Sequence, residues 1–133
     1  QGGDEINRPE AGKNYGWPVI TYGENYGGGA IGEGLSTKDG MEQPLHYWVP
    51  SIAPSGLLVY SGDLFPEWQG DIFTGSLNSD FISSLDPDAN HAEERIASDQ
   101  TGRVRDIVQA PDGSIWFLSV IDGAVYRLAP LTK

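Results

Sequence analysis

The feature that most constrains this sequence is an internal repeat in its second half. Seven residues recur with similar chemistry 43 positions further along: Gly70, Ile72, Phe73, Leu77, Ile82, Leu85 and Pro87 match Gly113, Ile115, Trp116, Val120, Val125, Leu128 and Pro130. A period of about 40 to 45 residues is typical of four-stranded propeller blades, which bury their faces only by stacking on one another. Two similar hairpins of an ordinary β-sandwich are the alternative interpretation.

Short β-type segments bounded by turn residues account for most of this region, and helical periodicity is nearly absent. The expected strands are residues 56–60, 71–77, 81–85, 104–109, 114–120 and 124–128. Pro111-Asp112-Gly113 and Asp122-Gly123 provide the preset φ, the Asx-type hydrogen bond and the glycine that tight reversals need. The sequence therefore predicts an all-β fold built from hairpins.

The first part of the chain has a different character. Six glycines are spread through residues 22–35, which predicts a long loop, and four aromatic residues lie in or near it: Tyr15, Trp17, Tyr22 and Tyr26. Loops of this length are uncommon in compact domains unless they are functional or mobile. A packed functional loop and a flexible surface excursion are both open interpretations.

The charge and the residue types narrow the choice of partners. A net charge of -11 disfavours nucleic acid and anionic membrane surfaces, and it suits a small neutral or cationic ligand better. The absence of cysteine excludes disulfides, thiol catalysis and thiolate metal sites. No apolar stretch approaches the roughly 20 residues that a membrane-spanning helix needs, and no signal-peptide pattern is present.

Three stretches, in order and approximate spacing, resemble the glucose/sorbosone dehydrogenase family. They are Gly3 to Asn7 with Gly12 to Pro18, then Ser51 to Gly56, and then Gly102 to Asp106. The resemblance implies a six-bladed β-propeller that carries pyrroloquinoline quinone (PQQ) in a central cavity beside calcium. This chain resembles its C-terminal third, about two to two and a half blades. Residues 1–50 would then be the loop-rich side facing cofactor and calcium, residues 51–100 one blade, and residues 101–133 the last blade.

Arg103 and Arg105 are the strongest candidates for binding an anion. They lie two apart on an expected strand, so we expect both side chains on one face, where two uncompensated guanidiniums would repel each other. PQQ carries three carboxylates, which guanidiniums bind with two parallel hydrogen bonds, and the resemblance implies that this pair contacts the quinone. The alternative is that both arginines pair with local acids such as Asp106 or Asp86.

For the metal, the resemblance implies that Glu5, through its carboxylate, and Tyr15, through its backbone carbonyl, hold a structural calcium. Asp4 resembles the family acid close to the catalytic calcium. Oxygen ligands suit this ion. The alternatives are a solvated charge for Glu5 and a turn-capping role for Asp4.

For the cofactor, the resemblance places five further positions beside the quinone. Tyr26 matches an aromatic that lies against the ring, and Ser51 a small hydroxyl at the cavity; a loop anchor and a turn hydroxyl are the alternatives. The segment Ser76-Leu77-Asn78 matches another contact, in which Asn78 stands where family members commonly have lysine. This departure weakens the expected binding of an anion.

The activity that the resemblance implies is oxidation of a sugar to a lactone, by hydride transfer to the quinone with a histidine base and calcium. We expect no catalytic residue in this chain, because the base belongs upstream; we interpret His46 as a packing or loop residue and His91 as an exposed turn residue. The chain alone is then expected to be inactive, so whether it is an enzyme by itself stays open. Export to the periplasm or the medium follows from the same resemblance.

A partial propeller exposes sheet faces and strand edges, so we expect a partner that covers them. The candidates are the missing N-terminal part and further copies that close the ring as a homo-oligomer. Two other functions stay open, namely a non-catalytic binding or assembly module and a lactonase-type hydrolase; the second would need more acidic ligands than the sequence offers.

Overall fold

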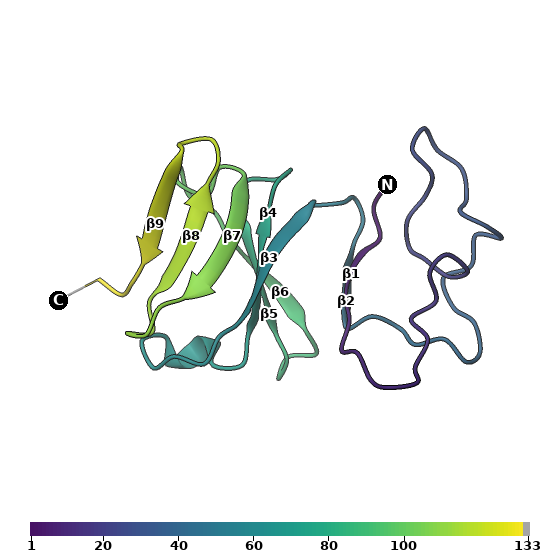
Figure 1. Cartoon of the computed structure of the whole chain (residues 1–133), viewed down its shortest axis with the longest axis horizontal. Coiled ribbons are helices and arrows are strands. Elements are labelled where there is room, and N and C mark those ends of the chain that lie inside the picture. Colours follow the sequence, from purple (N-terminus) through teal and green to yellow (C-terminus); the bar gives the residue numbers. More distant parts are fainter. Residues whose placement is uncertain (132–133) are drawn as a thin grey trace. The chain divides into compact units, whose positions relative to one another are not determined.

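The computed structural model describes residues 1–131 and divides into two compact units, Gln1–Ile52 and Ala53–Lys133. All regular elements in the described residues are β-strands except one short 3-10 helix, η1 (Pro66–Trp68) (Figure 1). The prediction of an all-β fold is therefore confirmed. None of the helical segments among residues 1–131 is long and apolar enough to cross a membrane.

The first unit contains one small antiparallel sheet and long connecting loops. Strand β1 (Asp4–Ile6) pairs with β2 (His46–Trp48). Two isolated bridges, Ile20 to Leu35 and Glu24 to Ala30, tie the intervening chain together. Its buried apolar side chains are those of Ile6, Ile20, Trp48 and Ile52. The sequence analysis did not predict β1 and β2, because three residues are too few to display an alternating pattern.

In the second unit the first sheet is a consecutive four-stranded meander. It consists of β3 (Pro54–Val59), β4 (Ile72–Ser76), β5 (Ile82–Asp86) and β6 (Ala92–Ile96), in that spatial order, with every pair antiparallel. Strand β6 was not predicted. Three of its five residues are charged, and such residues are depleted in strands, so it pairs through its backbone on the edge of the sheet.

The second sheet is a three-stranded meander of β7 (Val104–Gln109), β8 (Ile115–Ser119) and β9 (Ala124–Leu128). The predicted turn before β8 is present: Gly113 has a φ of +83°, and the Asp112 carboxylate accepts hydrogen bonds from the backbone N–H of Ser114 at 3.0 Å and from its hydroxyl at 2.6 Å. The bounds of β7 and β9 are those that the sequence analysis predicted.

The core of the second unit lies between its two sheets. Phe73 and Ile82 of the first sheet cluster with Val104, Ile107 and Phe117 of the second, and all five side chains are buried. Each sheet is made of consecutive strands, so the chain completes the first sheet before it begins the second. In a Greek-key sandwich the chain crosses between the two sheets instead. This arrangement favours stacked blades over the sandwich alternative.

The innermost strands of the two sheets approach each other closely, and glycines make this approach possible. A Cβ on Gly56, whose φ is +62°, would lie 2.6 Å from the Asp106 carboxylate, and a Cβ on Gly75 would lie 2.7 Å from a methyl group of Val104. The Ser55 hydroxyl also donates a hydrogen bond to the backbone carbonyl of Val104. Strands β3 and β7 are therefore locked side by side.

Replacing Asp112 with asparagine is expected to reduce stability at neutral pH and to have a clearly smaller effect near pH 2, where about half of the carboxyl is protonated. Its hydrogen bonds from Ser114 and its ion pair with Arg127, at 3.0 Å, lower the pKa of the Asp112 carboxyl to about 2. Because the pKa is lower in the folded than in the unfolded chain, the charged form stabilises the fold above pH 4, and this contribution is lost as the pH falls to about 2.

Thermal unfolding across this pH range tests the expectation. The control is Asp99→Asn, since the exposed Asp99 side chain makes no hydrogen bond or ion pair with any residue in 1–131. If Asp112→Asn lowers the Tm by the same amount at pH 7 and at pH 2, the expected loss of this contribution in acid is contradicted.

Candidate functional site

The candidate residues fall into two groups, one on each unit. On the second unit, β7 begins at Val104, so Arg103 precedes the strand with a left-handed φ of +50°. The prediction that both arginines lie on one strand is therefore wrong for Arg103, and alternation along a strand does not set their relative directions. A register shift between Val104 and Ile107 further interrupts the regular pairing next to Arg105.

The position of Arg103 is fixed by the turn between β4 and β5. Its backbone N–H donates to the Asp80 carboxylate at 2.9 Å, and its guanidinium donates to the carbonyl of Leu77 at 3.2 Å. The neighbouring Thr101 hydroxyl donates to the carbonyl of Asp80 at 2.8 Å. The structure thus brings Arg103 together with the predicted segment Ser76-Leu77-Asn78, although the two are more than twenty residues apart in sequence.

Within that segment the three residues differ in exposure. The buried Ser76 hydroxyl accepts a hydrogen bond from the N–H of Ser79 at 2.9 Å and so shapes the turn. The N–H of Leu77 donates to the carbonyl of Ala53 at 3.1 Å, and the carbonyl of Leu77 accepts from the guanidinium of Arg103. Asn78 is exposed in the turn itself.

Both guanidiniums are exposed, and neither forms an ion pair with a residue in the described part of the chain. The two local acids that were considered as partners are engaged by backbone amides. Asp106 accepts from its neighbour Ile107 at 2.9 Å, and Asp86 accepts from Asp88 at 2.8 Å. Two uncompensated guanidiniums on a protein with a net charge of -11 fit an anionic ligand such as a carboxylate.

On the first unit, Asp4 and Glu5 lie on β1. Glu5 accepts a hydrogen bond from the side-chain amide of Asn7 at 3.0 Å. One carboxylate oxygen of Asp4 and the amide oxygen of Asn7 are buried without a hydrogen-bond partner among the described residues. Buried orphaned oxygens suit a hard cation such as calcium. Because adjacent residues of a strand project to opposite faces, Asp4 and Glu5 lie on different faces of β1.

No group of three or more His, Cys, Asp or Glu side chains in residues 1–131 is arranged to hold a metal. A calcium here would therefore need amide and carbonyl oxygens as well. The Tyr15 hydroxyl donates to the carbonyl of Arg8 at 2.6 Å and accepts from the N–H of Glu10 at 2.8 Å, which fixes the loop carrying the Tyr15 carbonyl. The sequence analysis assigned no role to Asn7; its position next to the two acids was the available signal.

The aromatic residues of the long loop do not share one role. Tyr26 is 93% exposed at the tip, so it is no anchor, whereas Tyr22 stacks on Tyr47 with ring centroids 3.6 Å apart. Trp17 is 70% exposed. Ser51 is half-buried just after β2. The loop therefore combines a packed base with an exposed tip.

The histidines follow the sequence interpretation closely. His46, on β2, packs edge-on against Trp48 with ring centroids 4.7 Å apart, as a packing residue would. His91 lies in the turn between β5 and β6 with a φ of +58°, and it is half-buried where we expected exposure. The reason is that its N–H donates to the carbonyl of Asp86 at 2.7 Å, which folds the turn back on the strand.

Two consecutive antiparallel meanders that pack face to face define part of a β-propeller. Residues 1–127 match the family model of the glucose/sorbosone dehydrogenases, and the chain belongs to this family. Among curated proteins it is 43% identical over 134 aligned positions to the aldose sugar dehydrogenase YliI of Escherichia coli (strain K12), covering 98% of this chain and 36% of that protein.

Solved structures agree. A crystal structure of a glucose dehydrogenase superposes with a TM-score of 0.81 at 38% identity, covering 99% of this chain and 39% of that one. The apo-form of the soluble aldose sugar dehydrogenase from Escherichia coli superposes with a TM-score of 0.79 at 42% identity, over 88% of this chain and 35% of that one. The chain thus spans about a third of the length of these relatives. The fold is all-β and is part of a six-bladed propeller.

Proposed function

We propose that this chain supplies part of the cofactor-binding wall of a PQQ- and calcium-dependent sugar dehydrogenase. The observation that carries the proposal is the pair Arg103 and Arg105, both exposed, whose guanidiniums form no ion pair in the described residues of a strongly acidic chain. When bound, the quinone would supply the hydride acceptor for oxidation of the sugar, and calcium would supply a Lewis acid at the quinone. The whole protein would convert a sugar to a lactone.

In this proposal Arg103 binds a carboxylate of the quinone. The Leu77 carbonyl accepts from its guanidinium and the Asp80 carboxylate from its backbone, so the cation is oriented before the ligand arrives, which lowers the entropic cost of binding. Arg105 adds a second charge. Asn78 is neutral where family members commonly have a lysine. The affinity for the quinone is therefore expected to be lower than in relatives that carry this lysine.

The remaining cofactor contacts are proposed for Tyr26, Ser51 and Ser76. Tyr26 offers an exposed aromatic face suited to a flat conjugated ring. The two serines contribute hydroxyls; that of Ser76 also shapes the turn that holds Arg103. Under this proposal residues 1–50 form the loop-rich cofactor side, residues 51–100 one blade and residues 101–133 the last blade.

For calcium, we propose that Glu5 and the backbone carbonyl of Tyr15 hold a structural ion, with Asn7 as an additional oxygen donor, and that Asp4 lies close to a catalytic ion. The orphaned oxygens of Asp4 and Asn7 support it. No histidine of this chain is assigned as the base, since His46 packs on Trp48 and His91 lies in a strand-connecting turn. We therefore expect the isolated chain to bind quinone without oxidising sugar. A location in the periplasm or outside the cell belongs to the same proposal.

A non-catalytic propeller-derived module is the second candidate function. The observation that favours it is Asn78, which removes a cation from the turn that also positions Arg103. Such a module would keep the stacked sheets and bind neither quinone nor sugar.

Titration of the chain with PQQ separates the two functions. We expect saturable binding, seen as a change in quinone absorbance and strengthened by calcium, and no dye reduction with glucose. Citrate, a tricarboxylate without the ring system, serves as competitor: weak competition would indicate a site for the quinone, and full competition mere attraction of anions. No binding up to about millimolar quinone, where binding free energy falls to roughly 4 kcal/mol, would leave only the module.

A further inference from the structure

Two turns flank Arg103, one from each sheet of the second unit. On one side, the guanidinium of Arg103 donates to the carbonyl of Leu77 in the β4–β5 turn. On the other side lies the β8–β9 turn, where the N–H of Val120 donates to the carbonyl of Arg103 at 3.1 Å. The next N–H, that of Ile121, donates to the carbonyl of Gly102 at 3.4 Å. Arg103 is therefore attached to both turns.

The internal repeat makes the β8–β9 turn the counterpart of the β4–β5 turn. Val120 is the repeat equivalent of Leu77, and the same displacement of 43 positions makes Ile121 the equivalent of Asn78. Leu77 and Asn78 belong to the segment that is proposed to contact the quinone. The second sheet therefore presents its own version of this segment, with an apolar side chain where the first sheet has an amide.

The backbone beside the two turns is also alike. The residue before the first strand of each sheet, Ala53 before β3 and Arg103 before β7, has a left-handed φ of +50°. The carbonyl of Ala53 accepts from the N–H of Leu77 at 3.1 Å, as the carbonyl of Arg103 does from that of Val120. The two turns thus occupy equivalent places in the two sheets.

The side chains of Val120 and Ile121 form an exposed apolar surface next to the cation. Val120 is 43% exposed and Ile121 is 66% exposed. A Cβ on Gly102 would lie 3.1 Å from two carbon atoms of Ile121, so the Ile121 side chain lies over the glycine that precedes Arg103. We call Val120 and Ile121 the apolar pair.

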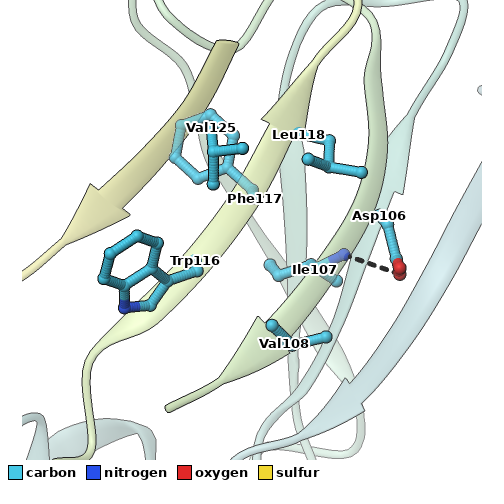
Figure 2. A pocket seen from close by; sticks show the side chains of 7 residues that line it. All are labelled: Asp106, Ile107, Val108, Trp116, Phe117, Leu118 and Val125. Atoms are coloured by element: carbon cyan, nitrogen blue, oxygen red, sulfur yellow. Dashed lines mark hydrogen bonds between the residues drawn. The ribbon is translucent and has the colours of Figure 1, made fainter.

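Another exposed apolar surface on the same sheet has an acid beside it. Val108 and Leu118 line a shallow depression of about 170 Å³, and Figure 2 shows them together with the carboxylate of Asp106. No arginine or lysine of residues 1–131 lines this depression. A ligand that carries several carboxylates is repelled there. The apolar pair beside Arg103 is the better place for the ring of such a ligand.

We propose that the apolar pair packs against the flat ring system of the ligand whose carboxylates bind Arg103 and Arg105. The inference rests on the proposed function, in which this ligand is PQQ. The guanidiniums bind the carboxylates, and the apolar side chains remove one face of the ring from water. The site therefore selects aromatic polycarboxylates over flexible ones of the same charge.

The test compares the wild-type chain with the variant Val120→Ala and Ile121→Ala in calorimetric titrations. The ligands are PQQ, benzene-1,3,5-tricarboxylate and citrate, which all carry three carboxylates, although citrate has no ring. The variant should bind the two aromatic ligands about tenfold more weakly, because it loses apolar contact area. Its affinity for citrate should stay within about twofold. The backbone hydrogen bonds to Gly102 and Arg103 do not involve the truncated side chains.

The matched control is Val108→Ala with Leu118→Ala. It removes the same number of carbon atoms from side chains that are 52% and 39% exposed. All three ligands should bind this control within about twofold of the wild-type affinity. If the control weakens binding of the aromatic ligands as much as the test variant, the proposal is overturned, because apolar truncation anywhere on the sheet would have the same effect.

The remaining outcomes separate this inference from the proposed function. If the variant binds PQQ as tightly as the wild type, or loses citrate as strongly as the aromatic ligands, the inference is overturned and the proposed function stands. If the chain binds benzene-1,3,5-tricarboxylate through the apolar pair but does not bind PQQ, the inference holds and the proposed function fails. Binding of neither aromatic ligand overturns both.

Discussion

Replacing both Arg103 and Arg105 with alanine is expected to weaken the binding of PQQ by at least about 100-fold. A hydrogen bond to a charged group contributes roughly 1.5 to 3 kcal/mol, so the loss of two such contacts corresponds to two or more orders of magnitude in Kd. Both side chains are exposed, so the fold should remain intact. The measurement is the quinone absorbance titration, with circular dichroism to confirm that the sheets persist.

The matched control is Arg95→Ala with Arg127→Ala. This pair removes the same two positive charges, but Arg95 and Arg127 are engaged in surface ion pairs with Glu93 and Asp112. If the control weakens binding as much as the test pair, general attraction of the anion explains the effect. Undiminished binding after loss of Arg103 and Arg105 would show that the cofactor contacts lie elsewhere. Lysine at both positions should restore charge and only part of the affinity, because it lacks the planar fork.

Replacing Phe73 with alanine is expected to destabilise the second unit by roughly 3 to 5 kcal/mol, the usual cost of removing a fully buried phenylalanine. Phe73 is 0% exposed and meets Trp68 and Tyr60 edge-on, at centroid distances of 5.4 Å and 6.3 Å. A cavity at this position would open between the two sheets. Urea unfolding followed by tryptophan fluorescence measures the loss.

The internal repeat supplies the control for this variant, because Trp116 occupies the equivalent position in the second sheet. Trp116 is 38% exposed, so Trp116→Ala should cost the isolated chain only about 1 kcal/mol. If both variants lower the free energy of unfolding by a similar amount, the face that carries Phe73 is no more important for packing than the face that carries Trp116.

The architecture of the second unit could be predicted because its strands follow strong local rules. Strands β7 and β9 contain residues typical of strands, such as Val, Ile and Tyr, and are followed by turns that contain proline, so their bounds were predicted residue by residue. Strand β6 could not be found this way, because Ala92 to Ile96 is mostly charged and pairs only through its neighbour β5. The pairing of Asp4 with Trp48 bridges more than forty residues, and no local pattern encodes it.

The candidate site was predicted less completely, for a related reason. The residue types gave the hypothesis: two arginines close together in an acidic chain predict an anion, and this stays a prediction. The backbone conformation of Arg103 could not be predicted from the sequence. A left-handed φ on a non-glycine residue is set by tertiary contacts, here those with Asp80 and Leu77. The orphaned amide oxygen of Asn7 likewise depends on burial, which a sequence does not display.

Because Arg103 is attached to the β4–β5 turn, a change in this turn has a different consequence from a change in the buried core. The guanidinium donates to the carbonyl of Leu77 and the backbone N–H of Arg103 to the carboxylate of Asp80, whereas the buried side chains between the sheets take no part in holding Arg103. An insertion or substitution in this short turn therefore re-aims the cation and leaves the stacking of the sheets unchanged. Lineages that share this scaffold can diverge in ligand preference through a hairpin of a few residues, at little risk to folding.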